Sequence, residues 1–200
     1  MTDPAVAPPA PGRPSLGPLV DRFDRRVDAA MERLRGRTVP DRILLTASHL
    51  GDFSLVWHIV NVSRGLTSPR RQRQVPLLAV ALGAESLLVN QGLKRLFDRP
   101  RPTLEGDPRL PVRRPSTSAF PSGHASAAAF TATVLTGWDG RRSAPVWWGI
   151  AATVAASRAY VRIHHPSDVV AGMAVGAGLG LAARSLLREC CRRGRGCRWS

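Results

Sequence analysis

The stretch AFPSGHASAAAFTATVLTGW, residues Ala119–Trp138, contains no charged side chain over its whole length. A helix needs about 20 mainly apolar residues to cross the hydrocarbon core of a membrane. Two other blocks come close to this condition: Val169–Leu187 carries only Arg184, near its end, and Val75–Leu93 carries only Glu85. The three blocks predict membrane-spanning helices. The alternative interpretation is a soluble bundle in which the same helices are buried.

Two further apolar blocks are less decisive. Pro145–Ser157 is long enough to span only if its helix continues to Arg158 or beyond. Ile43–Val62 either spans the membrane or lies at its surface, because it contains the polar residues His49, Asp52 and His58. In the last block, the spacing of four residues favours close helix packing at Gly172, Gly176 and Gly180. The expected fold class is all-α: a polytopic membrane helical bundle of about five spans.

The distribution of charge supports the membrane interpretation. The 29 Lys and Arg residues exceed the 14 Asp and Glu residues, and Lys94 is the only lysine. The excess lies in segments between or beyond the apolar blocks, which is a membrane pattern that the mean hydropathy of −0.10 conceals. A net charge of +15 also indicates an anionic partner, which is a nucleic acid, an anionic membrane or a phosphorylated substrate.

The two ends of the chain differ from the apolar blocks. The proline-rich residues 1–18 are expected to form a disordered tail. Val20–Arg37 has apolar residues at steps of three and four, which predicts either an amphipathic helix on a membrane surface or an ordinary solvated helix. The basic tail, residues 189–200, contains three cysteines: Cys190, Cys191 and Cys197. This odd number argues against a disulfide framework, and free thiols are favoured over lipidation or metal binding.

The first motif with chemical potential is KRLFDRPRP, residues Lys94–Pro102. A proline holds the residue before it in an extended conformation and ends a helix. Lys94 and one of the arginines can therefore point from the membrane edge at the same anion. Taken alone, the motif is more often a basic loop flanking a span.

The second motif is PSGH, residues Pro121–His124, directly before an alanine-rich helix. The start of a helix offers free backbone N–H groups and the positive end of the helix dipole, which together bind anions. His124 in the first turn can exchange a proton near neutral pH. The alternative is a capped helix with an interfacial histidine.

The third motif is SRAYVRIHHPSD, residues Ser157–Asp168. A histidine is a nucleophile when a carboxylate holds its other ring nitrogen. Asp168 follows His164 by four residues across a Pro-Ser turn, which permits such a pair at the start of the last helix. Surface histidines beside a helix cap are the alternative.

Together the three motifs resemble the type 2 phosphatidic acid phosphatase family, the lipid phosphate phosphatases related to vanadium haloperoxidases. The family signature is K-x6-R-P, P-S-G-H and S-R-x5-H-x3-D, and every specified position matches. The match selects Arg101 over Arg99 in the first motif and His164 over His165 in the third. The resemblance covers roughly residues 75–187.

The resemblance implies a role for each matched residue. His164 is expected to be the nucleophile that forms a phosphohistidine, Asp168 to orient it, and His124 to protonate the leaving alkoxide and then activate water. The phosphoryl oxygens would be held by Lys94, Arg101, Ser122, Gly123 and Arg158. No metal and no cofactor is expected, because cations of the chain neutralise the phosphoryl group.

The expected function is metal-independent hydrolysis of a lipid phosphate monoester or diphosphate, polyprenyl or glycerolipid, within the membrane. A lipid phosphotransferase using the same site, or a non-enzymatic basic binder of membranes or nucleic acid, is the alternative. The favoured interpretation involves no nucleic acid. Head group and oligomeric state are left open.

The expected organisation follows from these features. It comprises a tail (1–18), an amphipathic interfacial helix (19–40), a membrane-embedded phosphatase domain (41–188) and a basic tail (189–200). Positive charge favours the cytoplasmic side, so most basic loops are expected there. This predicts a multi-pass protein of the cell membrane with an extracytoplasmic active site.

Overall fold

The computed structural model describes residues 16–102, 109–112 and 117–193, with side chains as far as residue 186. Within these ranges every regular element is a helix, as the apolar blocks predict. The main helices are α1 (Pro18–Glu32), α2 (Thr38–Gly51), α3 (Leu55–Gly65), α4 (Pro69–Leu87), α5 (Gly123–Asp139), α6 (Ala144–Tyr160) and α7 (Pro166–Arg193). Most of the predicted N-terminal tail and the side chains of the three cysteines lie outside the described residues.

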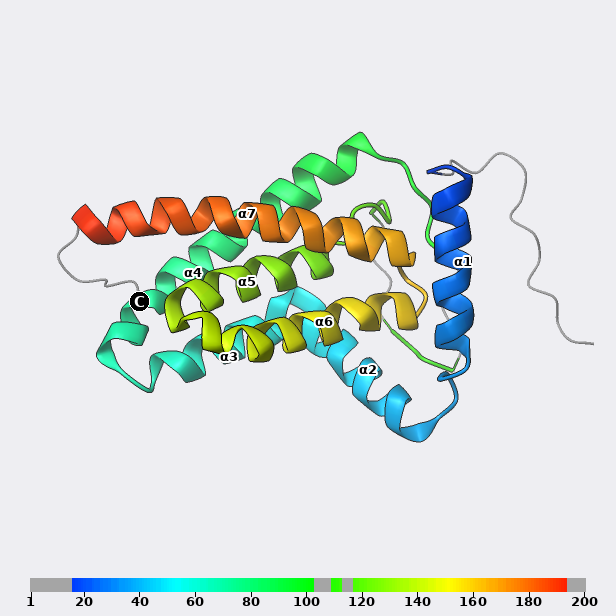
Figure 1. The fold of residues 1–200 in the computed structure, drawn as a ribbon, viewed down its shortest axis with the longest axis horizontal. Helices are drawn as coiled ribbons and strands as arrows, with labels where there is room; N and C mark the ends of the chain where they lie inside the picture. Colours follow the sequence, from blue (N-terminus) through cyan, green and yellow to red (C-terminus); the bar gives the residue numbers. More distant parts are fainter. Residues whose placement is uncertain (1–15, 103–108, 113–116, 194–200) are drawn as a thin grey trace, which may run out of the picture.

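Helix α5 is the centre of the bundle. Its alanine-rich sequence leaves little side-chain bulk, so α4, α6 and α7 pack around it and bury nearly all of its residues. Larger side chains such as Phe130, Leu135 and Trp138 fill the remaining space. Figure 1 shows α5, α6 and α7 running side by side, with α1 lying crosswise at one end.

Contact between α5 and α7 depends on the glycines of α7. A Cβ atom on Gly176 would lie 2.0 Å from the carbonyl oxygen of Ser126, and one on Gly172 would lie 2.3 Å from that of Ser122. A side chain at either position would therefore push the two backbones apart. This confirms the close packing predicted from the glycine spacing.

The helix of the charge-free block is shorter than the block itself. Residues 119–122 precede the helix, which begins at Gly123, so α5 has 17 residues. Helix α6 also has 17 residues, and both are about 26 Å long by their rise per residue, against about 30 Å for a hydrocarbon core. Residues 119–122 are non-helical and form part of the loop that leads into α5.

Three helical segments are long and apolar enough to cross a membrane: Thr38–Gly65, Pro69–Leu96 and Pro166–Leu186. Large apolar side chains are exposed on these segments, among them Val80 and Leu87 on α4 and Leu181 on α7. Exposure of such groups is expected where lipid rather than water surrounds the protein. These features support a membrane protein, and the number of five spans stays a prediction.

The first of these segments is bent. Asp52–Ser54 interrupts it, and Phe53 and Ser54 have positive φ angles of 53° and 58°, which non-glycine residues rarely adopt. The bend separates α2 from α3 and turns Asp52 toward the interior. Asp52 is one of the polar residues that made the membrane assignment of Ile43–Val62 uncertain, and the fold places it inside the bundle.

Helix α1 docks by a charged face. Asp24, Asp28 and Glu32 are spaced by four residues and so lie on one side of the helix. Buried Arg35 pairs with Asp28 at 2.6 Å and with Glu32 at 2.8 Å, while its Nε donates to the carbonyl of Tyr160. The helix ends at Glu32, earlier than the predicted Arg37, because the chain turns there to begin α2.

We expect Gly176→Ala to lower the melting temperature in detergent by about 5 °C, because the added methyl group overpacks the α5–α7 contact. Gly178→Ala is the matched control, since a Cβ at Gly178 meets no atom within 4 Å. Thermal unfolding followed by circular dichroism measures both. Equal melting temperatures for the two variants would show that the contact does not limit stability.

Candidate active site

The three sequence motifs meet at one end of the bundle. Lys94 follows the π-helical turn Leu88–Gly92 that ends α4, His124 begins α5, Arg158 lies near the end of α6 and Asp168 begins α7. The loops between them are joined by backbone hydrogen bonds. The N–H of Ser122 donates to the carbonyl of Asp168 at 3.0 Å, and that of Ala119 donates to Arg99 at 2.9 Å.

The imidazole of His164 is held in one tautomer. Its Nδ1 lies 2.8 Å from the carbonyl oxygen of Ala119, which can only accept, so Nδ1 carries the proton. Its Nε2 lies 3.3 Å from Nη1 of Arg101, which can only donate. The lone pair of Nε2 therefore faces the cationic side of the site. A buried imidazole with this orientation is suited to nucleophilic attack.

Asp168 lies beside His164 without a short hydrogen bond to it. Its Oδ2 is 3.8 Å from Nδ1 of His164 and accepts from the backbone N–H of His165 at 2.8 Å. Its Oδ1 accepts from Arg99. The hydrogen bond that orients the imidazole thus comes from Ala119, while the carboxylate supplies negative charge next to the ring.

Three buried cations lie close to one another beside this buried imidazole. Lys94 lies within electrostatic reach of Arg101 and Arg158, and both Lys94 and Arg101 lie within reach of His164. Each of the three cations is at most 6% exposed. We call Lys94, Arg101 and Arg158 the cationic cluster.

Some donors in this cluster and beside it have no acceptor within the described part of the chain. Among the side chains that the structure describes, Nε and Nη2 of Arg158 and the hydroxyl of Ser122 are buried without a hydrogen-bond partner. Buried donors normally find acceptors, because an unpaired buried group costs about 1–3 kcal/mol. A phosphoryl group has oxygens that can accept from all three. Gly123, at the start of α5, lies next to Ser122 and adds its backbone to this part of the site.

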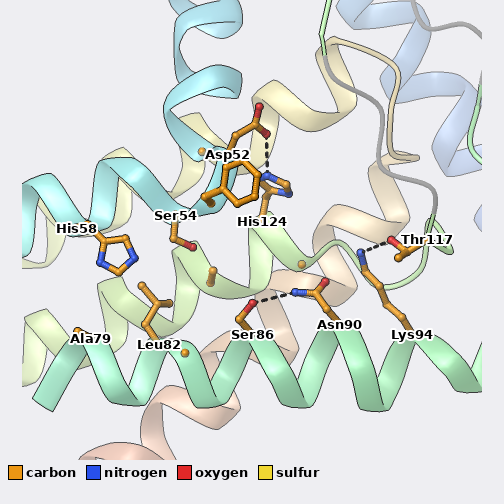
Figure 2. A pocket seen from close by; sticks show the side chains of 15 residues that line it. Asp52, Ser54, His58, Ala79, Leu82, Ser86, Asn90, Lys94, Thr117 and His124 are labelled. Atoms are coloured by element: carbon orange, nitrogen blue, oxygen red, sulfur yellow. Dashed lines mark hydrogen bonds and ion pairs between the residues drawn. The ribbon is translucent and has the colours of Figure 1, made fainter. Parts of the chain in front are cut away.

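His124 faces the cavity next to this cluster. Figure 2 shows the ring of His124 above α4 and its hydrogen bond to Asp52. Lys94 lies beyond the end of α4, in the turn Leu93–Leu96. Nε2 of His124 lies 3.0 Å from Oδ1 of Asp52, and the same oxygen lies 3.3 Å from Nη1 of Arg158. A carboxylate in this position fixes the ring and stabilises its protonated form.

The cavity at the site measures about 590 Å³ and opens between α4, the Asp52–Ser54 bend and the start of α5. Its wall includes Lys94, Gly123 and His124. Among the described residues, no three His, Cys, Asp or Glu side chains gather as metal ligands.

A family model described as PAP2 superfamily matches residues 75–190. The chain belongs to this superfamily. A decaprenylphosphoryl-5-phosphoribose phosphatase of Mycobacterium tuberculosis (strain CDC 1551 / Oshkosh) is 32% identical over 176 residues, which cover 84% of this chain and 94% of the relative. The phosphatase of the same name from Mycolicibacterium smegmatis is also 32% identical, over 62% of this chain and 67% of the relative.

Solved structures of PAP2 proteins have the same fold. The transmembrane PAP2 type phosphatidylglycerolphosphate phosphatase of Bacillus subtilis superposes with a TM-score of 0.67, at 22% identity over 87% of this chain and 89% of the other. Aquifex aeolicus LpxE gives a TM-score of 0.66, at 22% identity over 86% and 98%. The resemblance inferred from the three motifs is confirmed, and this PAP2 chain is an enzyme of the phosphatase type.

Two residues outside the PAP2 match complete the site, and the sequence motifs did not reveal either. Asp52 contacts His124, and its only signal in the sequence was a carboxylate within an apolar block. Asp24 of α1 lies 2.8 Å from Arg99 and accepts from the N–H of Ser167 at 2.7 Å. Arg99 therefore bridges Asp24 and Asp168, whereas the neighbouring Arg101 contacts His164.

We expect Asp52→Asn to lower kcat by at least about 10-fold with a smaller change in KM, because general acid–base catalysis contributes about 10²–10⁴-fold and His124 loses the charge beside it. Steady-state phosphate release measures the effect. Asp98→Asn, which changes an exposed carboxylate near the same end, is the control. Equal kcat values for both variants would contradict a role of Asp52 at His124.

A second prediction concerns pH. Burial, opposed by the Asp168 carboxylate, lowers the pKa of His164 to about 3, against about 6.5 for a free imidazole. Between these values the unfolded chain binds a proton that the folded chain does not, so stability rises with pH. The slope of the unfolding free energy against pH gives the difference in bound protons between the unfolded and the folded chain. We expect His164→Asn to lower this difference by up to one proton. His49→Asn, at an exposed position, is the control, and an unaltered slope in His164→Asn would contradict the burial of a neutral imidazole.

Proposed function

We propose that this PAP2 chain is an integral-membrane phosphatase that hydrolyses a lipid phosphate monoester or diphosphate through a phosphohistidine. The observation that carries the proposal is the orientation of His164, whose Nε2 lone pair faces the cationic cluster while its Nδ1–H is held by Ala119. A phosphoryl group bound by this cluster has its phosphorus next to the nucleophilic nitrogen.

The reaction proceeds in two displacements at phosphorus. Nε2 of His164 forms a bond to phosphorus as the bond to the leaving oxygen breaks, and protonated His124 gives its proton to that oxygen. Neutral His124 then removes a proton from water, and the resulting hydroxide attacks phosphorus and releases His164. The N–P bond breaks, phosphate leaves, and both histidines return to their starting states.

Electrostatic stabilisation comes from residues of the chain. Lys94, Arg101 and Arg158 face the oxygens on which negative charge gathers, and Ser122 and Gly123 add neutral donors at the start of α5. Asp168 stabilises the positive charge that His164 acquires on phosphorylation. In this proposal the reaction uses no metal and no cofactor.

The lipid substrate reaches the site from the membrane. Five spans bring all motifs to one end of the bundle: Thr38–Gly65, Pro69–Leu96, α5, α6 and α7. The opposite end carries basic residues, among them Arg64 and Arg71. By the positive-inside rule that end is cytoplasmic, so the active site is extracytoplasmic in the cell membrane.

Helix α1 fits an interfacial position at the catalytic end. It lies crosswise to α7 in Figure 1, as a helix in the membrane plane does. Its acidic face docks on the protein, while Leu19 and Phe23 are 75% and 42% exposed. These apolar groups are suited to insertion between lipid head groups. The domain proposed for residues 41–188 then lies below it in the membrane.

We expect detergent-solubilised protein to release phosphate from lipid phosphates, and His164→Ala and His124→Ala each to lower the rate by at least about 100-fold, because each removes a group that acts on the reacting atoms. Release of inorganic phosphate with and without EDTA measures this, and chelation is expected to change nothing. His49→Ala is the histidine control.

Two results would refute the proposal. One is full turnover by His164→Ala, which would exclude a phosphohistidine at this position. The other is the absence of phosphate release by the wild type from every lipid phosphate offered. Activity that EDTA abolishes would contradict the metal-independent mechanism alone.

A further inference from the structure

One wall of the cavity is formed by α4 and by the turns Leu88–Gly92 and Leu93–Leu96 that continue it, and this wall changes character along its length. From the catalytic end it presents the cation Lys94, then the polar side chains of Asn90 and Ser86, and then Gly83, Leu82 and Ala79. Figure 2 shows Lys94, Asn90, Ser86, Leu82 and Ala79 in this order along one side of α4. A ligand that lies along the wall therefore meets positive, polar and apolar surface in sequence.

The helical rise gives the scale of these zones. Within α4, at about 1.5 Å per residue, Ala79 lies about 10 Å from Ser86 along the axis, and Asn90 and Lys94 follow in the two turns beyond the end of α4. A phosphoryl group at Lys94 thus places the next part of the substrate beside the two polar side chains. Hydrocarbon surface of the wall begins only beyond them.

The two polar side chains form an ordered pair. Nδ2 of Asn90 donates to the hydroxyl of Ser86 at 3.1 Å. Asn90 is also packed closely on α5, because a Cβ on Gly123 would lie 2.6 Å from its Oδ1. The π-helical turn Leu88–Gly92 contains Asn90, and such turns often mark functional sites. We call Asn90 and Ser86 the amide–hydroxyl pair.

The opposite wall combines polar side chains with the apolar residues Phe53 and Ala127. Asp52 and His124 face the pair across the cavity, and Ser54 and His58 follow along the bend and α3. A hydrocarbon chain attached directly to the phosphate would displace water from these polar groups without replacing the hydrogen bonds of that water, which is unfavourable. Hydroxyl or ester oxygens at this level would satisfy them.

We propose that the substrate carries a polar, oxygen-bearing spacer, a sugar or a glycerol, between the hydrolysed phosphate and the hydrocarbon, and that Asn90 and Ser86 bind this spacer. The inference rests on the proposed phosphatase function and deepens it. Asn90 and Ser86 are specificity-determining residues in this arrangement, since they contact the leaving group and no reacting atom.

The test compares kcat/KM for substrates with one hydrocarbon chain. Farnesyl phosphate has no spacer, and farnesylphosphoryl-ribose 5-phosphate has a sugar spacer, while lysophosphatidate supplies a glycerol spacer. We expect the wild type to prefer at least one spaced substrate over farnesyl phosphate by about 10-fold or more. The two spaced substrates distinguish sugar from glycerol as the source of the oxygens.

Variants then assign the preference to the pair. Asn90→Leu, which keeps the size but removes both hydrogen-bonding atoms, is expected to lower kcat/KM for the preferred spaced substrate about 10-fold and to leave farnesyl phosphate unchanged or improved. Ser86→Ala is expected to act in the same direction with a smaller change. Gln91→Leu is the matched control, because Gln91 is an exposed amide in the same turn that does not line the cavity.

The outcomes separate the two proposals. Equal losses for spaced and unspaced substrates in both Asn90→Leu and Ser86→Ala, or a wild-type preference for farnesyl phosphate, would overturn the spacer subsite while leaving the phosphatase intact. Retained turnover of farnesyl phosphate reports that a variant is folded. No phosphate release from any of the three substrates by the wild type would instead refute the proposed function.

Discussion

Positive charge withdrawn from water at one end of the bundle is the constraint on which the rest of the structure depends. Lys94, Arg99, Arg101 and Arg158 are all nearly fully buried there. Burying a cation is costly unless it is paired or hydrogen-bonded. Arg99 has carboxylate partners and Arg158 has one, whereas Arg101 donates to the backbone carbonyls of Ile163 and Thr117. Among the described side chains, Nε and Nη2 of Arg158 and the hydroxyl of Ser122 are buried without an acceptor, which makes this end suited to a phosphoryl group.

The surrounding helices supply carboxylate partners for two of these cations. The bend between α2 and α3 adopts two positive φ angles, and with them it directs Asp52 to Arg158 and His124. Helix α1 contributes Asp24 to Arg99 from a part of the chain that lies outside the superfamily match. Local backbone strain is tolerated where the surrounding contacts determine the conformation. The catalytic end is therefore completed by elements that precede the three motifs.

Close packing of α5 on α7 fixes the distances within the site. Gly172 and Gly176 bring the two backbones together just below the start of both helices, where His124 and Asp168 lie. On the other side, Gly123 allows Asn90 to approach α5, so the phosphate end and the polar part of the cavity share one wall. Small residues in this way determine both the rigidity of the site and the shape of the space beside it.

The meeting of the three motifs at one end was shown only by the fold. The sequence by itself determined the helical membrane character and the superfamily, because hydrophobic length, glycine spacing and motif order can be read along the chain. It also distinguished Arg101 from Arg99, which the structure places in different surroundings. Only the tertiary structure decided that Ala119 holds the Nδ1–H of His164, that Asp52 and Asp24 join the site, and that polar and apolar surfaces follow one another along α4. These features depend on contacts between residues 45 to 75 positions apart and on a backbone bend. Such contacts form only in the folded chain, where buried charged groups must be paired.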